Sequence, residues 1–428
     1  MRLFDGLRYG LMGLPLAFVA LPLYVILPNY YAKNFAVPLA SLGVLLLVVR
    51  MFDAVVDPLL GRWADRLFRR TPAQIFGQIA ALAAGLVLGF VALFFPPTFI
   101  LQSTETFFTP TLLLWAGWCL VVCYVSFSAL SIAHQSWGAM LGGDAAKRSR
   151  VVAWREGLGL LGVVLASVTP LLFGLTVTSV LLTGFLALGI GAWAYAPRPA
   201  IASVASSQEG CSLWAPLLQP AFRQLLLIFM VNGIASAVPA TLILFFVQDR
   251  LQAPAFMESW FLGVYFVAAA LALPLWTRWI AQFGLEKSWL TGMVLAVGVF
   301  VFAALLDAGD TTEFLIVCAL SGVAMAVDLV APAALLAGLL QNSEKKIPDA
   351  EKMPEAGTYF GWWNLATKFN LALAAGISLP LLNLLGYAPG MRSPEALQSL
   401  TWTYCLLPCG LKVIAALLLL FHTLRKPL

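Results

Sequence analysis

Charged residues are scarce in this chain. Asp, Glu, Lys and Arg together make up 11% of the 428 residues, whereas 61% of the residues are hydrophobic. The mean hydropathy is +0.91. This balance excludes an ordinary soluble domain, in which about 25% of the residues are charged. The composition instead predicts a polytopic helical membrane protein.

Side chains that carry enzyme chemistry are scarce as well. The two histidines, His134 and His422, lie far apart in the sequence, which disfavours an intramembrane enzyme with clustered catalytic groups or metal ligands. No glycine-rich loop with a lysine follows the phosphate-binding pattern, which disfavours transport driven by ATP. The six cysteines lie mostly in apolar segments without a nearby His, Asp or Glu. We therefore expect them to be small buried side chains and not metal ligands.

The net charge of +5 does not indicate nucleic-acid binding, because the basic residues gather in alternate loops. By the positive-inside rule, this alternation predicts that both termini are cytoplasmic. The first residues lack the pattern of a cleaved signal peptide, so we expect none. We expect a multi-pass monomer in a bacterial inner (plasma) membrane, with lipids and a small-molecule substrate as partners, no nucleic acid and no cofactor.

Twelve apolar runs divide the chain into two sets of six. They lie near residues 9–31, 39–64, 74–95, 111–140, 152–174 and 178–196, and near 222–248, 256–280, 288–306, 313–339, 358–386 and 399–423. The pattern predicts an all-α membrane protein with twelve transmembrane helices in two six-helix bundles. The predicted domains are residues 1–196, a cytoplasmic linker at 197–220, and residues 221–428. A weak repeat between residues 58–63 and 274–279 supports two related halves.

One apolar run contains a stripe of charges. Arg50, Asp53 and Asp57 are spaced i, i+3 and i+7, so a helix places all three on one face. A charge at the centre of a bilayer costs at least about 2.5–3.5 kcal/mol. The chain must neutralise such charges internally, and the usual reason for keeping them is the movement of an ion or a polar solute.

The segment from Gly61 to Arg70 resembles the signature loop between helices 2 and 3 of the major facilitator superfamily. It reads Gly-Arg-Trp-Ala-Asp-Arg-Leu-Phe-Arg-Arg. The resemblance implies that Asp65, Arg66 and Arg69 form a gate, which locks the cytoplasmic helix ends in one state and releases them in another. The alternative is a solvated basic loop.

A longer match, Arg50-Met-Phe-Asp-Ala-Val-Val-Asp-Pro58, resembles helix 2 of the glycoside–pentoside–hexuronide cation symporters. The similarity extends along the chain, through Tyr9-Gly10, Arg155, Asn232 and Lys368. It implies an alternating-access symporter in which two helix-2 carboxylates and a helix-4 hydroxyl bind the coupling cation. The residues that match these positions are Asp53, Asp57 and Ser128.

The resemblance also assigns roles to three cationic side chains. Lys368 would stand in for the cation when the site is empty, with Arg50 as a second charge-coupling residue, and Arg155 would lie at the cytoplasmic edge of the sugar site. A static Arg50–Asp53 pair is the alternative for Arg50. For Arg155, the alternative is a salt bridge to neighbouring loop carboxylates.

Three residues differ from the family pattern, and these differences affect the expected transported solute and the expected coupling ion. Ala17 and Ser131 stand where the melibiose carrier has sugar-binding carboxylates, which argues against a melibiose-like galactoside. Val56 replaces an asparagine that is associated with sodium use. Its loss favours H+ as the coupling ion, although Asp53 and Asp57 would still be able to hold Na+ as its metal ligands.

Further polar residues lie in the apolar runs. Asp328 and Lys412 have opposite signs, and we expect a structural ion pair between them. Glu156 follows Arg155 on a helix, so its side chain should point about 100° away and face different neighbours. The candidate substrate contacts are Asn232, Trp363 and Asn364, with helix packing or interhelical hydrogen bonds as the alternatives.

These features together predict a cation-coupled (H+ or Na+) symporter of a small polar solute, a glycoside or related sugar. The alternative is a carrier of lysolipids or other amphipathic solutes, because lysolipid carriers resemble this family and share the helix-2 motif.

Overall fold

Helices make up the regular secondary structure throughout the described part of the chain. The structure is a computed structural model that describes residues 3–101, 105–199, 212–345 and 356–424. Within these ranges, eleven helical segments are long and apolar enough to cross a membrane. The charged helix α4 (Leu39–Leu67) is not among the eleven, although its 29 residues are sufficient in length. The predicted all-α membrane fold is confirmed.

The chain forms two compact units. The first unit comprises residues 1–142, 154–213 and 340–365, and the second comprises residues 143–153, 214–339 and 366–428. This division differs from the domains predicted above in the segments 143–153 and 340–365, and the predicted domain limits stay a prediction. Residues 200–211 of the predicted linker lie outside the described residues.

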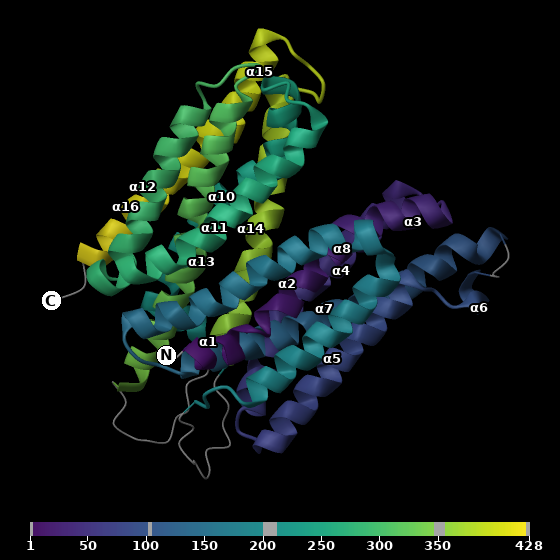
Figure 1. Cartoon of the computed structure of the whole chain (residues 1–428), viewed down its shortest axis with the longest axis vertical. Helices are drawn as coiled ribbons and strands as arrows, with labels where there is room; N and C mark the ends of the chain where they lie inside the picture. The colour runs from purple at the N-terminus through teal and green to yellow at the C-terminus, as the bar shows by residue number, and fades with distance from the viewer. Residues whose placement is uncertain (1–2, 102–104, 200–211, 346–355, 425–428) are drawn as a thin grey trace. The chain divides into compact units, whose positions relative to one another are not determined.

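The first unit contains the helices of the N-terminal half of the chain, with α8 from Trp154 onward, together with residues 340–345 and the start of α14. Their bounds are α1 (Leu3–Gly10), α2 (Gly13–Leu21), the π-helical segment η1 (Pro22–Ile26), α3 (Leu27–Phe35), α4 (Leu39–Leu67), α5 (Pro72–Phe94), α6 (Thr98–Leu101), α7 (Glu105–Met140), α8 (Ala145–Ala194) and α14 (Ala356–Leu384). Helix α7 packs against both α4 and α5 (Figure 1). Helix α8 has 50 residues, with a break at Gly174, whose φ is 76°. The break lies at the last residue of the predicted apolar run 152–174.

A capping box sets the start of α5 directly after α4. The Thr71 hydroxyl accepts the backbone N–H of Gln74, and the Gln74 side chain accepts the backbone N–H of Thr71. Pro72 occupies the first helical position, where its missing N–H costs nothing. These three residues therefore end the loop that carries the basic motif of Arg66 to Arg70.

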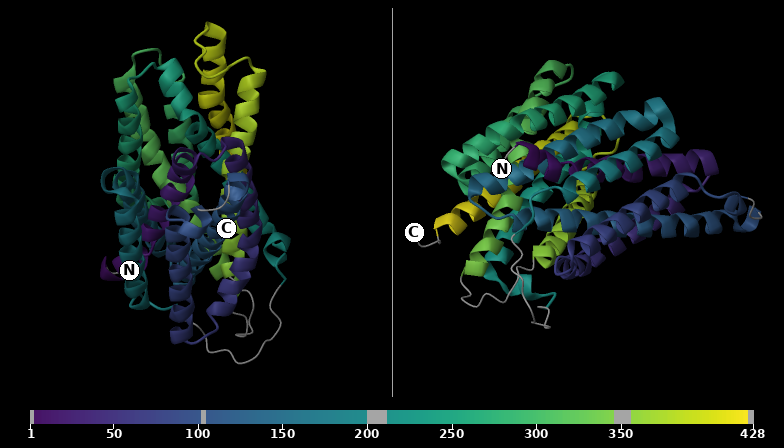
Figure 2. Two further views of the ribbon diagram at one scale, coloured as in Figure 1. Left: turned by 90° about the vertical axis from the view of Figure 1, so that its right-hand side faces the viewer. Right: turned by 60° about the horizontal axis from the view of Figure 1, so that its bottom comes forward.

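The second unit contains the helices of the C-terminal half. Their bounds are α9 (Ala215–Leu218), α10 (Pro220–Phe245), the π-helical segment η2 (Phe246–Arg250), α11 (Ala255–Phe283), α12 (Leu285–Ala303), α13 (Thr311–Lys345), α15 (Pro394–Thr401), the π-helical segment η3 (Trp402–Leu406) and α16 (Leu407–Leu424), together with most of α14. Helix α16 packs against both α10 and α12, in the green and yellow part of the ribbon in Figure 2.

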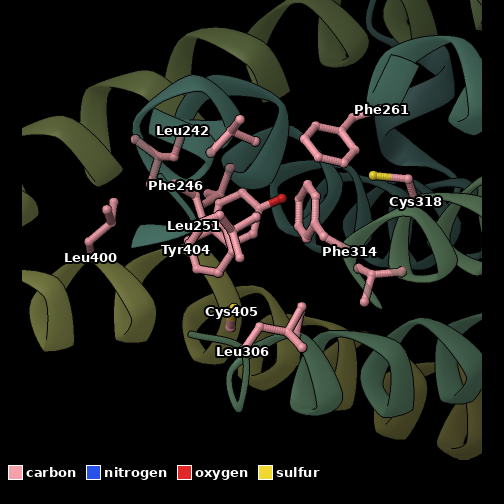
Figure 3. Packing of buried hydrophobic residues seen from close by; sticks show 14 of the residues in the cluster. Leu242, Phe246, Leu251, Phe261, Leu306, Phe314, Cys318, Leu400, Tyr404 and Cys405 are labelled. Carbon is pink, nitrogen blue, oxygen red and sulfur yellow. The ribbon is translucent and has the colours of Figure 1, made fainter. Parts of the chain in front are cut away.

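Aromatic side chains hold one end of the second unit together. Phe246 of η2 stacks on Tyr404 of η3, with ring centroids 4.2 Å apart and planes inclined by 14°. Phe314 meets Phe246 at 5.6 Å and Phe261 edge-on at 4.8 Å. Figure 3 shows these rings between Leu242 and the Cys318 side chain. Such pairs contribute about 0.5–1.5 kcal/mol each beyond their buried area, so they fix α10, α11, α13 and α16 relative to one another.

Candidate functional site

A pair of carboxylates lies in the interior of the first unit, in the middle of α4. Asp53 is 3% exposed and Asp57 is 0% exposed, whereas Met51, Phe52 and Val55 are exposed on the other side of the helix. The two acids are one helical turn apart and share a face. Ionisable groups buried in an apolar helix are costly, and the pair therefore marks this part of α4 as a candidate site.

Ser128 of α7 lies against the first of these acids. Its hydroxyl donates to Oδ1 of Asp53 at 2.9 Å, and both side chains are buried. The structure thus brings together two of the three residues that the family resemblance assigned to a cation site. Carboxylate and hydroxyl oxygens suit either H+ or Na+. Their role as cation ligands stays a prediction.

Arg50 has an aromatic partner. Its guanidinium carbon lies 4.4 Å from the centroid of the Tyr24 ring. Tyr24 belongs to the π-helical segment η1, and π-helical turns inside longer helices are frequent at functional sites. The ring of Tyr24 also lies 5.7 Å from that of Tyr124 on α7. The face of Tyr24 therefore stabilises the Arg50 charge close to the acidic pair.

Glycines bring the backbones of α4 and α14 into direct contact. A Cβ atom added at Gly361 would lie 2.6 Å from the carbonyl oxygen of Asp57 and 2.9 Å from Cα of Pro58. At Gly61, a Cβ atom would lie 2.3 Å from the carbonyl oxygen of Gly357. Only glycine permits approaches this close. The contact begins at the carboxylate pair and runs one turn beyond it.

Asp65 caps the first turn of α14. Its carboxylate accepts the backbone N–H groups of Gly357 and Thr358 at 2.6 and 2.8 Å, and the Thr358 hydroxyl at 2.7 Å. A carboxylate at a helix N-terminus satisfies otherwise unpaired donors and interacts favourably with the helix dipole. Arg66 and Arg69, the other predicted gate residues, are exposed. Asp65 therefore joins the end of α4 to the start of α14, and the gate role of Asp65, Arg66 and Arg69 stays a prediction.

Gln135 is a polar residue of this unit that the sequence did not single out. Its side-chain amide donates to the Ser131 hydroxyl at 2.9 Å and to Oδ1 of Asn364 at 3.3 Å. The amide of Asn364 donates to the carbonyl of Phe360 in its own helix. All three polar side chains are half-buried. The i, i+4 spacing of Ser131 and Gln135 could have identified Gln135 from the sequence, because this spacing places both side chains on one face of α7.

The expectation for Glu156 was wrong. Oε1 of Glu156 accepts Nε of Arg155 at 2.9 Å and also forms a salt bridge with the same guanidinium. A 100° separation of Cβ atoms does not keep these side chains apart, because three methylene groups let the guanidinium turn back toward its neighbour. Arg155 therefore has a helical carboxylate as partner and not a loop carboxylate. Its predicted place in a sugar site stays a prediction.

His134 is a fully buried part of helix packing. Its Nε2 lies 2.8 Å from the carbonyl oxygen of Tyr9, and the Tyr9 hydroxyl donates to the carbonyl of His134. The two rings stack with centroids 4.3 Å apart. A carbonyl accepts only from a protonated nitrogen, so Nε2 carries the hydrogen. This reciprocal pair fixes the end of α1 against α7.

A polar network occupies the interior of the second unit. Nζ of Lys412 donates to Oδ2 of Asp328 and to Oδ1 of Asn232, both at 2.9 Å. The indole N–H of Trp289 donates to Oδ1 of Asp328 at 2.8 Å. The structure thus brings together the oppositely charged residues that the sequence paired. It also places Asn232, a predicted substrate contact, in an interhelical hydrogen bond and only 3% exposed.

A family profile described as MFS/sugar transport protein matches residues 8–196 and 215–426. The chain belongs to this family. Its members are transporters, so the match supports a membrane transporter and not an enzyme. A search of curated protein sequences returned no significant match.

Solved structures share the fold of this MFS protein. A bacterial homologue of the iron transporter ferroportin, in an outward-facing state, aligns with a TM-score of 0.74 and 15% identity over 99% of this chain and 100% of that chain. The Escherichia coli fucose:proton symporter aligns with a TM-score of 0.67 and 16% identity, over 98% of each chain. A human organic anion transporter aligns with a TM-score of 0.63 and 15% identity, over 98% of this chain and all of the other. At these identities the likeness shows the fold alone.

Two remaining candidates of the MFS chain lie on α14. Trp363 is buried, and its neighbour Trp362 donates its indole N–H to the carbonyl of Leu213 at 2.8 Å. These positions fit helix packing, the alternative stated for the tryptophans. Lys368 is half-buried in the second unit, and its charge-coupling role stays a prediction.

Proposed function

We propose that this transporter is a cation-coupled symporter of a small polar solute, a glycoside or related sugar. The observation that carries the proposal is the pair of buried acids on α4, with the Ser128 hydroxyl bonded to Asp53 at 2.9 Å. Burial of an ionisable group in a membrane is costly, so two buried acids in one transmembrane helix indicate a functional role for their charge. The finer assignment to the glycoside–pentoside–hexuronide symporters is part of this proposal.

The coupling follows from neutralisation of the acidic pair. Binding of H+ or Na+ at Asp53 and Asp57 would neutralise the buried carboxylates, and the family resemblance assigns to Arg50 and Lys368 the role of supplying positive charge when the cation is absent. Coupling requires that the loaded and unloaded protein differ in their preference for the two facing states. Neutralisation of buried charge would give such a preference when the two facing states expose the acidic pair to water to different extents.

The α4–α14 contact is a suitable element for a gate. Asp57 and Gly361 lie in one tight backbone contact, and Asp65 caps α14 about two turns further along α4. A change in the charge of Asp57 therefore acts directly beside the contact that must separate. Packed elements with two discrete arrangements transmit such local changes.

The cargo would be recognised by hydrogen-bonding side chains beside this region. Among the predicted substrate contacts, Asn364 is the best supported. Its side chain is half-buried, and its Oδ1 accepts a hydrogen bond from the Gln135 amide. A neutral amide pair can exchange its mutual hydrogen bond for bonds to solute hydroxyls. Arg155 would contribute together with Glu156 as a neutral pair.

The test is a transport screen in vesicles with the purified full-length protein. Uptake of glycosides, uronides and lysolipids is measured under an imposed proton gradient, an imposed sodium gradient, and neither. We expect gradient-driven accumulation of a glycoside. Accumulation of a lysolipid instead would favour the alternative cargo, and solute uptake that no ion gradient drives would overturn the coupling.

A further inference from the structure

The Asp328–Lys412 network of the second unit has a buried side and an accessible side. The lysine side chain is 5% exposed and bonded to both Asp328 and Asn232. The Asp328 side chain is 15% exposed, and Ser236, one turn after Asn232 on α10, is exposed. An ion pair with a purely structural role gains nothing from an accessible carboxylate. The accessible side of the network therefore contains the groups that could contact a solute.

Ser236 and Asp328 present two hydrogen-bond acceptors close together. The Ser236 hydroxyl lies 3.1 Å from the carbonyl of Asn232 and 3.5 Å from Oδ2 of Asp328. Its single proton goes to the nearer acceptor, because 3.5 Å is long for an O–H···O bond. The hydroxyl oxygen and the carboxylate then both keep lone pairs, and these lone pairs can accept donors from a solute.

The rest of the network positions this carboxylate. Trp289 donates to Oδ1 and Lys412 donates to Oδ2, so donors on two helices fix the carboxylate plane. Each of its oxygens keeps a further lone pair for a ligand. Trp289, Lys412 and Asn232 are thus positioning residues, and the residues that would touch the solute are Ser236 and Asp328.

The charges select the class of solute. We propose that Ser236 and Asp328 form a subsite for the hydroxyl groups of a neutral polyhydroxylated solute. A cation here would meet the Lys412 ammonium 2.9 Å from the carboxylate, and an anion would meet the carboxylate itself. A neutral hydroxyl group is repelled neither by the Lys412 ammonium nor by the Asp328 carboxylate. The inference rests on the proposed function and narrows its cargo to uncharged glycosides, in preference to uronates or lipid phosphates.

The test is equilibrium binding to purified full-length protein in detergent, without any ion gradient. The probes are the methyl glycosides of glucose, galactose and xylose, with glucuronate and galacturonate as charged counterparts, measured by titration calorimetry. We expect at least one neutral glycoside to bind more tightly than both uronates. Ser236→Ala should weaken that binding about 3- to 10-fold, the usual effect of one lost hydrogen bond, and Ser236→Thr should restore it.

Thr241→Ala is the matched control on the same helix. The Thr241 hydroxyl bonds to the carbonyl of Ala237 in its own helix, so its loss should leave the affinity unchanged. Asp328→Asn alone leaves a buried lysine without its carboxylate and is therefore paired with Lys412→Met. The double variant should retain its melting temperature and lose at least about 10-fold in affinity.

The outcomes separate this inference from the proposed function. Ser236-dependent binding without gradient-driven uptake would support the subsite and overturn the symport. Gradient-driven uptake with equal affinities in the Ser236→Ala and Thr241→Ala variants would overturn the subsite alone. Tighter binding of uronates than of every neutral glycoside would also overturn the subsite.

Discussion

Gly361→Ala tests whether the α4–α14 contact is a closed gate. The added Cβ would lie 2.6 Å from the carbonyl oxygen of Asp57 and 2.9 Å from Cα of Pro58. Cβ atoms essentially never lie within 3.0 Å of another non-bonded atom, and both clashing atoms belong to the backbone, so one helix must move. Overpacking of this kind costs about 1–3 kcal/mol. The equilibrium constant between the closed and the open contact should fall by the corresponding factor, about 5- to 160-fold.

The assay reports the opening of the contact at the start of α14. Ala356 is 1% exposed, so a cysteine placed there in a cysteine-free background reacts with a water-soluble maleimide only when the contact opens. When opening is rare and fast, the labelling rate is proportional to the open population. Gly361→Ala should therefore raise the labelling rate about 5- to 160-fold.

Gly376→Ala supplies the control on the same helix. A Cβ added at Gly376 meets no other atom within 4 Å, so the substitution removes the same flexibility without a clash. It should leave the labelling rate within about twofold of the parent, because its effect is limited to helix propensity. Equal labelling in the Gly361→Ala variant and the parent would refute the tight contact. An increase of the same size in Gly376→Ala would refute the steric cause.

Three further predictions follow from hydrogen bonds in the two units. Ser128→Ala removes the donor to Asp53 and should raise the cation concentration for half-maximal uptake about 10-fold, with Ser128→Thr close to the parent. Asp65→Asn weakens the cap on α14 and should raise cysteine labelling at its first turn by about 3- to 10-fold. Burial, together with the Asp249 carboxylate that accepts its hydroxyl, raises the pKa of Tyr387 above its ordinary value of 10.0. The folded protein then keeps this proton while the unfolded chain loses it, so the melting temperature should fall above about pH 10 more steeply in the parent than in Tyr387→Phe.

The sequence was sufficient to locate the buried charges. Asp53 and Asp57 stand in an apolar run, and the cost of burying charge predicts that they turn away from lipid, as the structure places them. The pairing of Asp328 with Lys412 was predicted in the same way, because these side chains carry opposite charges in apolar segments that offer few other polar groups. Hydropathy alone predicted the helical membrane fold, because backbone groups in a bilayer must be satisfied within each helix.

Close backbone approaches and contacts between neutral side chains of distant segments could not be predicted from the sequence. The approach of Gly61 to Gly357 depends on how two helices cross, and a glycine in a single sequence does not reveal its neighbour. Gln135 was missed for the same reason, because its partner Asn364 lies 229 positions away. The Arg155–Glu156 pair was missed because the directions of the two Cβ atoms do not determine where a long, flexible arginine side chain ends.

The central claim is that Asp53 and Asp57 couple an ion to the movement of a solute. Its most direct test is uphill uptake by vesicles that contain the Asp57→Asn variant or the Asp53→Asn/Asp57→Asn double variant, under the ion gradient that drives the parent. We predict that Asp57→Asn abolishes accumulation against the solute gradient, while solute exchange without a gradient survives in part. Normal uphill accumulation by the double variant would contradict the claim.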